Sequence, residues 1–273
     1  MIDSSNLRRT DCVSFEDTAD TSPVLEIRRL SVHAGNRTIL RDVSLSVAAH
    51  QVFGIVGPSG AGKSTLLRAI NRLLDLRPGF RVDGSVWLRG RDIYARDADP
   101  DELRVRIGFL FQQPVVFPIS IEANVLFGLR HHRSLRRSEK MQTVEKSLRT
   151  VALWPEVKDR LRESALRLSV GQQQRLCLAR TLAVDSEIIL MDEPTSALDA
   201  RSTEAIEQLM LALKRDRTII LVTHDLVQAR RITDWIACLC PKDGAGQVLE
   251  SACCDAFFSS PVCQKVFERL DEP

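Results

Sequence analysis

Short apolar runs alternate with helical patterns from residue 24 onward. Val24–Leu30 and Val43–Val47 alternate apolar and polar side chains, which is typical of strands with one solvent-facing side. Shorter, almost continuously apolar runs follow at Val52–Val56, Ile107–Phe111, Ile188–Met191 and Ile219–Val222. Their length predicts strands that are buried on both faces, as in a parallel sheet covered by helices.

Helical periodicity occupies several of the intervals between these runs. Apolar side chains recur at three- and four-residue spacing in two stripes, namely Leu176, Ala179, Leu182 and Ala183, and then Ile206, Leu209, Met210 and Leu213. Residues 66–74, soon after the first buried run, carry a helical pattern as well. Strands that alternate with helices along the chain predict an α/β fold.

The middle of the chain, from about residue 113 to residue 168, carries mostly helical patterning and few strand signals. Ile121, Val125 and Leu129 are spaced for one face of a helix. The basic run Arg130–Lys140 predicts a solvated loop or the start of a helix.

These patterns predict one α/β domain at residues 23–250, into which a helical subdomain is inserted at about residues 113–170. The polar residues 1–22 lack sustained periodicity, so we expect a flexible N-terminal tail there. Residues 251–273 are expected to form a C-terminal tail.

Composition narrows the function classes. Of the 273 residues, 44% are hydrophobic and 27% are charged, which excludes intrinsic disorder as a class. The formal net charge is +2, whereas a dedicated nucleic-acid-binding protein usually carries a strongly basic face. No segment contains the roughly 18 apolar residues that a membrane span needs, and the N-terminal residues lack the apolar core of a secretory signal. At a membrane, other subunits would have to provide the spans.

The seven cysteines are distributed unevenly along the chain. Five of them lie near its C-terminal end, and no pair has the C-x-x-C spacing of common zinc sites: Cys238, Cys240, Cys253, Cys254 and Cys263. We expect reduced thiols, some of them buried as small hydrophobic side chains, rather than a zinc site.

A glycine-rich segment, GPSGAGKST at residues 57–65, fits the pattern G-x-x-x-x-G-K-[ST] between an apolar run and a helical pattern. Backbone amides of such a loop and the N-terminus of the following helix attract phosphate groups. We expect Lys63 to reach the β- and γ-phosphates and Ser64 to ligate Mg²⁺. The motif indicates a nucleoside triphosphate, but it is shared by kinases, GTPases, helicases and transport ATPases. The candidate nucleotide-binding residues are Gly57, Pro58, Ser59, Gly60, Ala61, Gly62, Lys63, Ser64 and Thr65.

A second candidate segment, IILMDE at residues 188–193, is an apolar strand that ends in two acids. Beside a bound phosphate, Asp192 can hold a hydrated Mg²⁺ and Glu193 can polarise the attacking water. A strand that simply ends in a surface acid pair is the alternative interpretation.

Four further motifs follow a fixed order around these two segments. They are FQQP with Gln112, LSVGQ at residues 168–172, DEPTSALD at residues 192–199 and VTHD with His224. Over about residues 24–250 this order resembles that of the ATP-binding-cassette (ABC) ATPases. The resemblance implies a P-loop NTPase (RecA-like) core with an N-terminal antiparallel β subdomain and an inserted helical subdomain.

The resemblance also implies roles for individual residues. Gln112 would contact Mg²⁺, together with Ser64 and Asp192, and would sense the transmembrane subunits. His224 would contact the γ-phosphate and hold the water in line with the catalytic Glu193. The signature closes over the γ-phosphate bound to a second subunit, and the D-loop lies at the dimer interface; these residues are Ser169, Val170, Gly171 and Gln172, and then Ser196, Ala197, Leu198 and Asp199.

Longer segments resemble the ATP-binding subunits of bacterial phosphate (Pst-type) importers, at residues 69–76, 90–99, 111–130 and 157–185. This implies ATP and Mg²⁺ as cofactors and a head-to-tail dimer of two copies. It also implies two transmembrane permease subunits, a substrate-binding protein in the periplasm or outside the cell, and no nucleic-acid partner. The expected location is the cytoplasmic face of the plasma membrane. Alternatives are another cargo, such as a polar amino acid or another oxyanion, and a soluble or regulatory ABC ATPase that is not coupled to transport.

Two residues depart from the family pattern. The usual Gly-Gly of the signature is Val170-Gly171, and a valine resists positive φ and limits backbone approach. If position 170 needs only an extended backbone, activity survives; if it needs φ > 0, closure suffers. The usual adenine-stacking aromatic is replaced by Ala34, next to His33, which lowers the expected adenine affinity by about 1–3 kcal/mol.

Overall fold

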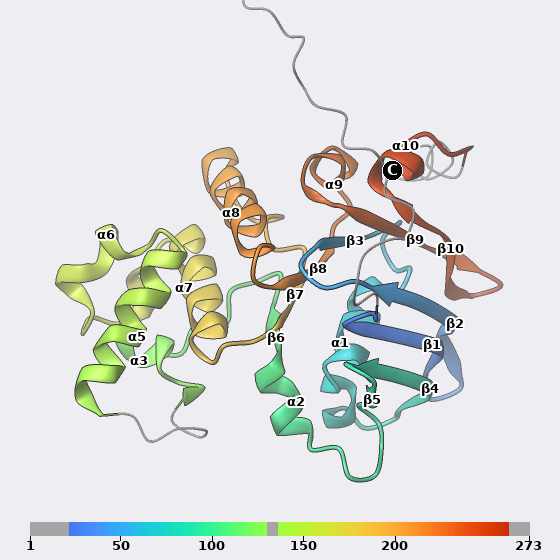
Figure 1. Ribbon diagram of the computed structural model, residues 1–273, viewed down its shortest axis with the longest axis horizontal. Coiled ribbons are helices and arrows are strands. Elements are labelled where there is room, and N and C mark those ends of the chain that lie inside the picture. Colours follow the sequence, from blue (N-terminus) through green and yellow to red (C-terminus); the bar gives the residue numbers. More distant parts are fainter. Residues whose placement is uncertain (1–21, 130–135, 262–273) are drawn as a thin grey trace, which may run out of the picture.

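The computed structural model describes residues 22–129 and 136–261. A ten-stranded sheet runs through the molecule in the order β5-β4-β1-β2-β10-β9-β3-β8-β7-β6 (Figure 1). Most of the predicted N-terminal tail, the first part of the basic run and the last twelve residues of the predicted C-terminal tail lie outside the described residues.

One end of this sheet is parallel, as the apolar runs predict. β3 (Val52–Val56), β8 (Thr218–Val222), β7 (Ile188–Asp192) and β6 (Ile107–Leu110) lie side by side and parallel, and β9 (Trp235–Lys242) adds a further parallel strand beside β3. Every residue of β3, β7 and β8 is buried. The prediction of strands covered on both faces is therefore confirmed.

The other end of the sheet is antiparallel and contains β1 (Leu25–Ala34), β2 (Arg37–Val47), β4 (Phe80–Leu88) and β5 (Arg91–Asp92). This confirms the N-terminal antiparallel subdomain that the family resemblance implies. β10 (Ala245–Cys253) joins the two ends, because it pairs antiparallel with β9 and bridges to β2 through Gly246 and Leu40.

Helices cover the two faces of the parallel strands, and the alternation of side chains shows which helix lies where. In β8, Ile220 and Val222 pack in the same core as α1 (Lys63–Ile70). Ile219 and Leu221 point to the opposite face, where they pack with α7 (Val170–Ala183) and α8 (Ala200–Leu213). The helix that follows the phosphate loop and the helix that follows the signature are thus separated by the sheet.

The predicted helical insertion contains α3 (Ile121–Val125), α5 (Arg137–Thr150) and α6 (Trp154–Val157), and it packs against α7 at one side of the molecule (Figure 1). Short 3-10 turns at Lys158–Arg160 and Ala165–Arg167 lead to α7. Its apolar side chains Ile121, Val125, Val144 and Leu148 share a core with α7 and α8, to which α7 contributes Leu176. The described part of the basic run is the exposed first turn of α5.

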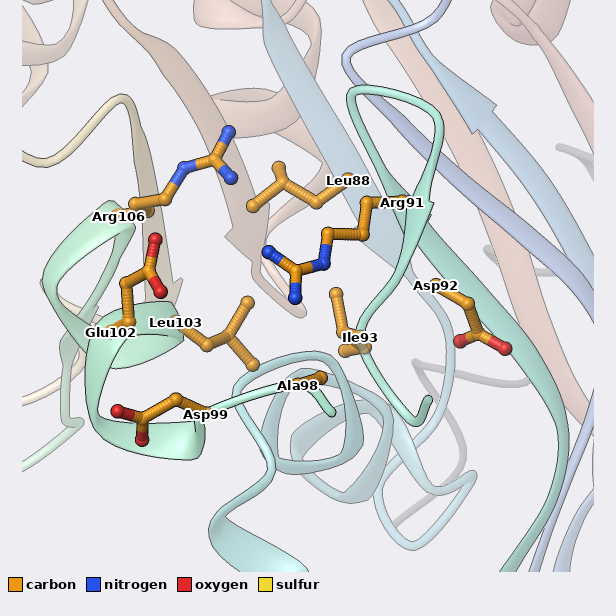
Figure 2. A pocket seen from close by; sticks show the side chains of 9 residues that line it. All are labelled: Leu88, Arg91, Asp92, Ile93, Ala98, Asp99, Glu102, Leu103 and Arg106. Carbon is orange, nitrogen blue, oxygen red and sulfur yellow. The ribbon is translucent and has the colours of Figure 1, made fainter. Parts of the chain in front are cut away.

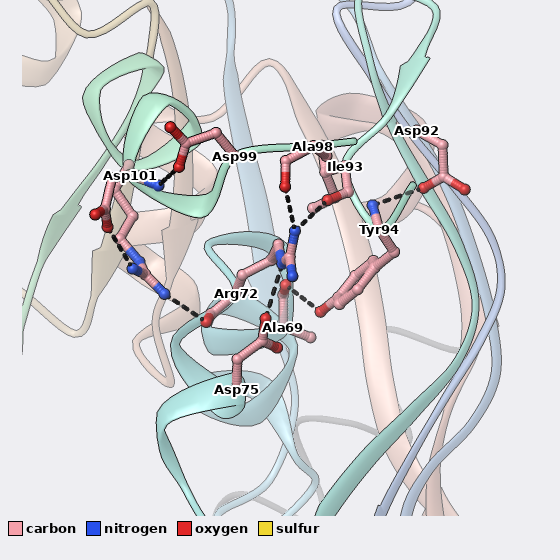
Figure 3. A network of polar contacts seen from close by, with 10 residues as sticks. Ala69, Arg72, Asp75, Asp92, Ile93, Tyr94, Ala98, Asp99 and Asp101 are labelled. Carbon is pink, nitrogen blue, oxygen red and sulfur yellow. Dashed lines mark hydrogen bonds and ion pairs between the residues drawn. The ribbon is translucent and has the colours of Figure 1, made fainter. Parts of the chain in front are cut away.

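A polar network fixes the C-terminal end of α1 to the segment that leads to β6 (Figure 3). Arg72, with a left-handed φ of 55°, donates to the carbonyl oxygen of Ile93 at 2.9 Å and forms an ion pair with Asp75 at 2.8 Å. The Tyr94 hydroxyl donates to the carbonyl oxygen of Ala69 at 2.7 Å, and its burial raises the pKa of the phenol. Arg104 of α2 (Pro100–Arg106) donates to the carbonyl oxygen of Arg72 at 3.0 Å, so the network holds α2 next to the 3-10 turn Leu73–Leu76 that follows α1.

The C-terminal part of the described chain packs onto the parallel core. The predicted domain boundary at residue 250 falls inside β10, and α10 (Cys254–Phe258) follows directly. Phe257 is fully buried together with Leu226 of α9 (Leu226–Ile232) and Cys238 of β9. Residues 254–258 therefore contribute to the hydrophobic core.

Replacement of Phe257 by alanine is expected to lower the free energy of unfolding by about 3–5 kcal/mol, because it leaves a cavity under α9 and β9. Urea denaturation of the purified chain measures the change. The matched control is Phe258→Ala, which removes a half-buried ring from the same helix and should cost less. Equal, small effects of both substitutions would show that α10 contributes little to the core.

Candidate active site

The phosphate loop connects β3 to α1 and packs closely against β9 on one side and β2 on the other. Gly57 has φ of 144°, and a Cβ atom there would lie 1.9 Å from the carbonyl oxygen of Leu239 in β9. Gly62 has φ of 95°, and a Cβ atom there would lie 2.6 Å from Cδ2 of Leu40 in β2. Both positions therefore require glycine for their positive φ, and at Gly57 the backbone carbonyl also leaves no space for a side chain.

The remaining loop residues differ in exposure. Ser59 and Gly60 form the exposed tip, whereas Ala61 is buried and its amide donates to the carbonyl oxygen of Pro58 at 3.3 Å. A Cβ atom on Gly246 would come within 2.0 Å of the Ala61 carbonyl oxygen, so β10 also contacts the loop. Thr65 is half-buried in the first turn of α1.

The N-terminus of α1 fits an anionic ligand. Its N-cap is Gly62, which has no side chain to accept from the first-turn amides, and the first turn contains no acidic residue. Lys63 is 5% exposed and donates its Nζ to the carbonyl oxygens of Gly57 and Pro58, at 2.7 and 2.9 Å. Burial lowers the pKa of Lys63, although Glu193 opposes this shift. The amides, the helix dipole and the ammonium group together suit a triphosphate.

Oxygen ligands for a metal ion lie next to this helix terminus. Ser64 donates its hydroxyl to Oδ1 of Asp192 at 2.7 Å, and an Arg68 guanidinium nitrogen lies 3.5 Å from Oδ2. Burial raises the pKa of Asp192, against the opposing effects of Ser64 and Arg68. A hydroxyl and a carboxylate within hydrogen-bonding distance form a donor set that fits Mg²⁺ beside a phosphate.

Three predicted residues meet on one carboxylate oxygen. Oε2 of Glu193 lies 3.2 Å from Nε2 of Gln112 and 3.2 Å from Nδ1 of His224. Gln112, Glu193 and His224 follow β6, β7 and β8, which are adjacent parallel strands, so their carboxyl ends bring the three side chains together.

The backbone holds Glu193 in a strained conformation. Its φ is 47°, which is unfavourable for a residue with a Cβ atom, and its amide donates to the carbonyl oxygen of Val222 at 3.0 Å. Ser196 Oγ donates to the Glu193 carbonyl oxygen at 3.1 Å and lies 3.2 Å from Gln112 Nε2. These contacts fix the direction of the Glu193 side chain toward His224.

The signature residues Ser169 and Gln172 cap α7. The Ser169 hydroxyl accepts from the Gln172 amide at 3.3 Å, and the Gln172 side chain accepts from the Ser169 amide at 3.0 Å. The spacing S-x-x-Q is the sequence signal of this capping box, which is a structural role in addition to the nucleotide contact predicted for both residues. Gln172 also donates to Glu156 at 2.7 Å.

Val170 is the first residue of α7 and has right-handed helical backbone, so this conformation does not require positive φ. Its side chain is 48% exposed. At Gly171 the requirement is space, because a Cβ atom there would lie 2.7 Å from Oγ of Ser202 in α8. Of the two alternatives that the sequence left open for position 170, positive φ is not the one adopted here, and the bulk of the valine side chain remains as a departure from the family pattern.

The predicted D-loop leads from the acidic strand into α8. Asp199 is the N-cap of α8, and its carboxylate accepts from the Ser202 amide at 3.0 Å and from the Ser202 hydroxyl at 2.9 Å. These hydrogen bonds lower the pKa of Asp199. Ala197 is exposed, and Leu198 packs partly against the core shared by α7 and α8.

Sequence reasoning missed Arg68. Ser64 and Arg68 are four residues apart and therefore lie on one face of α1, which brings both to Asp192. The four-residue spacing between Ser64 and Arg68 is the sequence signal from which this contact with Asp192 could be predicted.

His33, beside Ala34 at the end of β1, is held by neighbouring strands. Its Nδ1 lies 3.1 Å from Oγ1 of Thr38, and its Nε2 lies 3.2 Å from a carboxylate oxygen of Asp83. Both ring nitrogens are thus engaged within the antiparallel sheet.

The cysteines show no metal-ligand arrangement in the part of the chain that the structure describes, where no group of three or more His, Cys, Asp or Glu residues is suitably placed. Cys238 and Cys240 are buried in β9 with their sulfur atoms 3.5 Å apart. Cys263 lies outside the described residues. Nor does any described helix have the length and apolar composition of a membrane span.

A hollow between the β4–β5 hairpin and α2 lies apart from the phosphate loop (Figure 2). Two arginines face it, and both are paired with acids: Arg91 with Asp97 at 3.1 Å and Arg106 with Glu187 at 2.6 Å. None of its lining residues belongs to the predicted nucleotide site.

Comparison with known proteins agrees with these features. The family model described as ABC transporter matches residues 40–196. The chain is 44% identical to the phosphate import ATP-binding protein PstB of Rubrobacter xylanophilus over 257 residues, which cover 93% of this chain and 90% of that protein. It is 49% identical to the PstB protein of Thermotoga maritima over 215 residues, which cover 79% of this chain and 86% of that protein.

Solved structures show the same fold. One is cbiO1 of Clostridium perfringens, part of the ABC transporter complex cbiONQ, with a TM-score of 0.72 at 26% identity over 91% of this chain and 96% of that one. Another is the ATP-binding cassette MJ0796, a dimer in a post-hydrolysis state with ADP and Pi, with a TM-score of 0.69 at 30% identity over 84% of this chain and 98% of that one. The motif order, the fold and these similarities show that the chain belongs to the ABC transporter family, within which it is related to the PstB ATP-binding proteins.

Proposed function

We propose that this chain is the ATP-hydrolysing subunit of an importer of inorganic phosphate. ATP hydrolysis is supported by one observation: Gln112 and His224 both contact the carboxylate of Glu193, next to the hydrogen-bonded pair Ser64 and Asp192. The PstB relatives, at 44% and 49% identity over most of the chain, support phosphate as the cargo.

ATP and Mg²⁺ are the proposed cofactors. Lys63 and the amides at the start of α1 hold the phosphates, and Ser64, Asp192 and Gln112 provide the metal ligands. When bound, Mg²⁺ supplies neutralisation of the negative charge on the phosphates.

Glu193 acts as the group that orients and polarises the attacking water. Its strained backbone and the 3.2 Å contact with His224 restrict the orientation of the carboxylate, which supports a role in holding that water. Ser64 is engaged by Asp192, so we propose direct attack by water rather than a covalent enzyme intermediate.

The proposed assembly contains two copies of this chain and two transmembrane permease subunits at the cytoplasmic face of the membrane. α1 and α7 cover opposite faces of the sheet, so each nucleotide would lie between the phosphate loop of one copy and Ser169–Gln172 of the other. The helical insertion would receive the permease near residues 113–130. A substrate-binding protein would act indirectly, and no nucleic acid takes part.

Deletion of the gene is expected to lower uptake of radiolabelled phosphate at limiting phosphate and to leave sulfate and amino-acid uptake unchanged. Native protein restores uptake, whereas a Lys63→Ala variant does not, because it lacks the ammonium group that faces the phosphates. If phosphate uptake is unchanged and the uptake of another solute falls, that solute is the cargo instead of phosphate. If the deletion lowers the uptake of none of these solutes, a soluble or regulatory ATPase is favoured instead.

Glu193→Gln is expected to reduce ATP turnover by about 10²–10⁴-fold, because the amide cannot polarise water as the carboxylate does. The variant should accumulate as an ATP-bound dimer in size-exclusion chromatography. Glu204→Gln on the exposed side of α8 makes the same chemical change outside the site and should keep native turnover. Normal turnover in Glu193→Gln would refute the catalytic assignment.

Val170→Gly is expected to leave ATPase activity equal or to raise it, because glycine can adopt the helical φ of this position and the substitution removes an exposed side chain from the signature. Steady-state turnover of both proteins at saturating ATP measures the effect. A severe loss would mean that the Val170 side chain itself contributes to closure.

A further inference from the structure

A buried polar network lies behind the candidate catalytic residues. It connects the loop after β7, which carries Glu193, with α8 and α9. Gln228 of α9 is 2% exposed, and its Nε2 donates to Oγ1 of Thr195 at 3.0 Å and to Oε1 of Glu207 at 2.9 Å. Glu207 is 3% exposed and forms an ion pair with Arg231. One amide nitrogen thus joins the two helices to the loop that carries Glu193.

Both ends of this connection lie close to the reacting groups. Thr195 follows Glu193 by two residues, and Gln228 follows His224 by four. Asp225 caps α9: its carboxylate accepts from the Gln228 amide at 2.9 Å, and its own amide donates to Thr223 Oγ1 at 3.0 Å. A continuous set of hydrogen bonds therefore runs from the His224 loop through Gln228 to the Glu193 loop.

Packing alone does not account for Gln228. Its Oε1 is buried without a hydrogen-bond partner among the described residues, which is unfavourable, and an apolar side chain of similar volume would avoid that cost. The orientation of the amide is fixed by its nitrogen, which faces two acceptors. The residue is therefore placed to donate, at the expense of an unsatisfied oxygen.

We propose that Gln228 is a positioning residue for ATP hydrolysis, which sets the His224 loop relative to the Glu193 loop through Thr195. Glu193 and His224 approach to 3.2 Å, and they belong to separate loops after β7 and β8. Apart from that direct contact and the β7–β8 pairing, the Gln228–Thr195 bond provides a side-chain connection between these loops. The hydrogen bond from Gln228 to Glu207 holds α8 against α9. The hydrogen bond from Gln228 to Thr195 sets the alignment of the Glu193 and His224 loops. The proposal rests on the proposed function, because it assumes the roles of Glu193 and His224.

Gln228→Leu, which keeps the volume and removes both donor hydrogen bonds, tests the proposal in an ATPase assay of the purified full chain. We expect kcat to fall about ten- to a hundredfold, as for a small misplacement of catalytic groups, and KM for ATP to change less than twofold. KM is expected to be preserved because the hydrogen bonds of the Gln228 side chain go to Thr195 and Glu207 and not to the phosphate loop. Gln208→Leu, at an exposed position of α8, is the matched control and should retain native kcat.

Substitutions of Thr195 distinguish an effect on the alignment of the two loops from an effect on folding. Thr195→Val should reproduce the loss of kcat, Thr195→Ser should restore native kcat because it retains the hydroxyl, and Thr195→Val should add little to Gln228→Leu. If Gln228→Leu does not fold, the comparison of Thr195→Val with Thr195→Ser tests the proposal by itself.

Native kcat in Thr195→Val, or equal losses in Thr195→Val and Thr195→Ser, would overturn the proposal. A parallel change of kcat and KM in Gln228→Leu with a lowered denaturation midpoint would also overturn it and would indicate a structural role only. Glu193→Gln is measured beside these variants. If it loses turnover while Gln228→Leu does not, the positioning role fails and the proposed function stands; if it turns over normally, the assignment of Glu193 fails.

Discussion

Close backbone packing around the phosphate loop is the constraint on which the site depends. The carbonyl oxygen of Leu239 leaves no space for a side chain at Gly57, and β10 approaches the Ala61 carbonyl so closely that only Gly246 fits. The loop is thereby fixed between the parallel core and the antiparallel subdomain. Because the loop also starts α1, the same packing sets the positions of Lys63 and Ser64.

This packing also determines the electrostatics of the site. Burial lowers the pKa of Lys63 and raises that of Asp192, so it disfavours the charged form of both groups. Each retains polar partners, carbonyl oxygens for the lysine and the Ser64 hydroxyl for the aspartate. An anionic phosphate and a cation would supply the opposite charges that burial leaves unmatched. Desolvation of these two groups therefore supports the proposed binding of ATP and Mg²⁺ independently of the motif.

The sequence predicted the parts of the structure in which local pattern and tertiary environment agree. The runs at Val52–Val56 and Ile188–Met191 are apolar because helices cover both of their faces, and the motifs that follow adjacent parallel strands necessarily converge. It did not predict that β10 and α10 extend the core beyond residue 250, because Glu250 and Ser251 are polar and β10 is only partly buried. Nor could it show that Val170 adopts helical φ, since this follows from the capping of α7 by Ser169.

Contacts between distant segments explain what pattern reasoning could not reach. Gln228 and Thr195 are 33 positions apart, and no spacing rule relates them; they meet because β7 and β8 are neighbours and each is followed by a loop and a helix. The same adjacency brings Glu193 to His224. α7, which begins with the predicted signature residues, packs on the opposite face of the sheet from α1, so within one copy the signature lies across the sheet from the residues proposed to bind phosphate. In the dimer that we propose, a second copy would supply the signature, and the loops after β7 and β8 are the elements that closure of such a dimer would have to align.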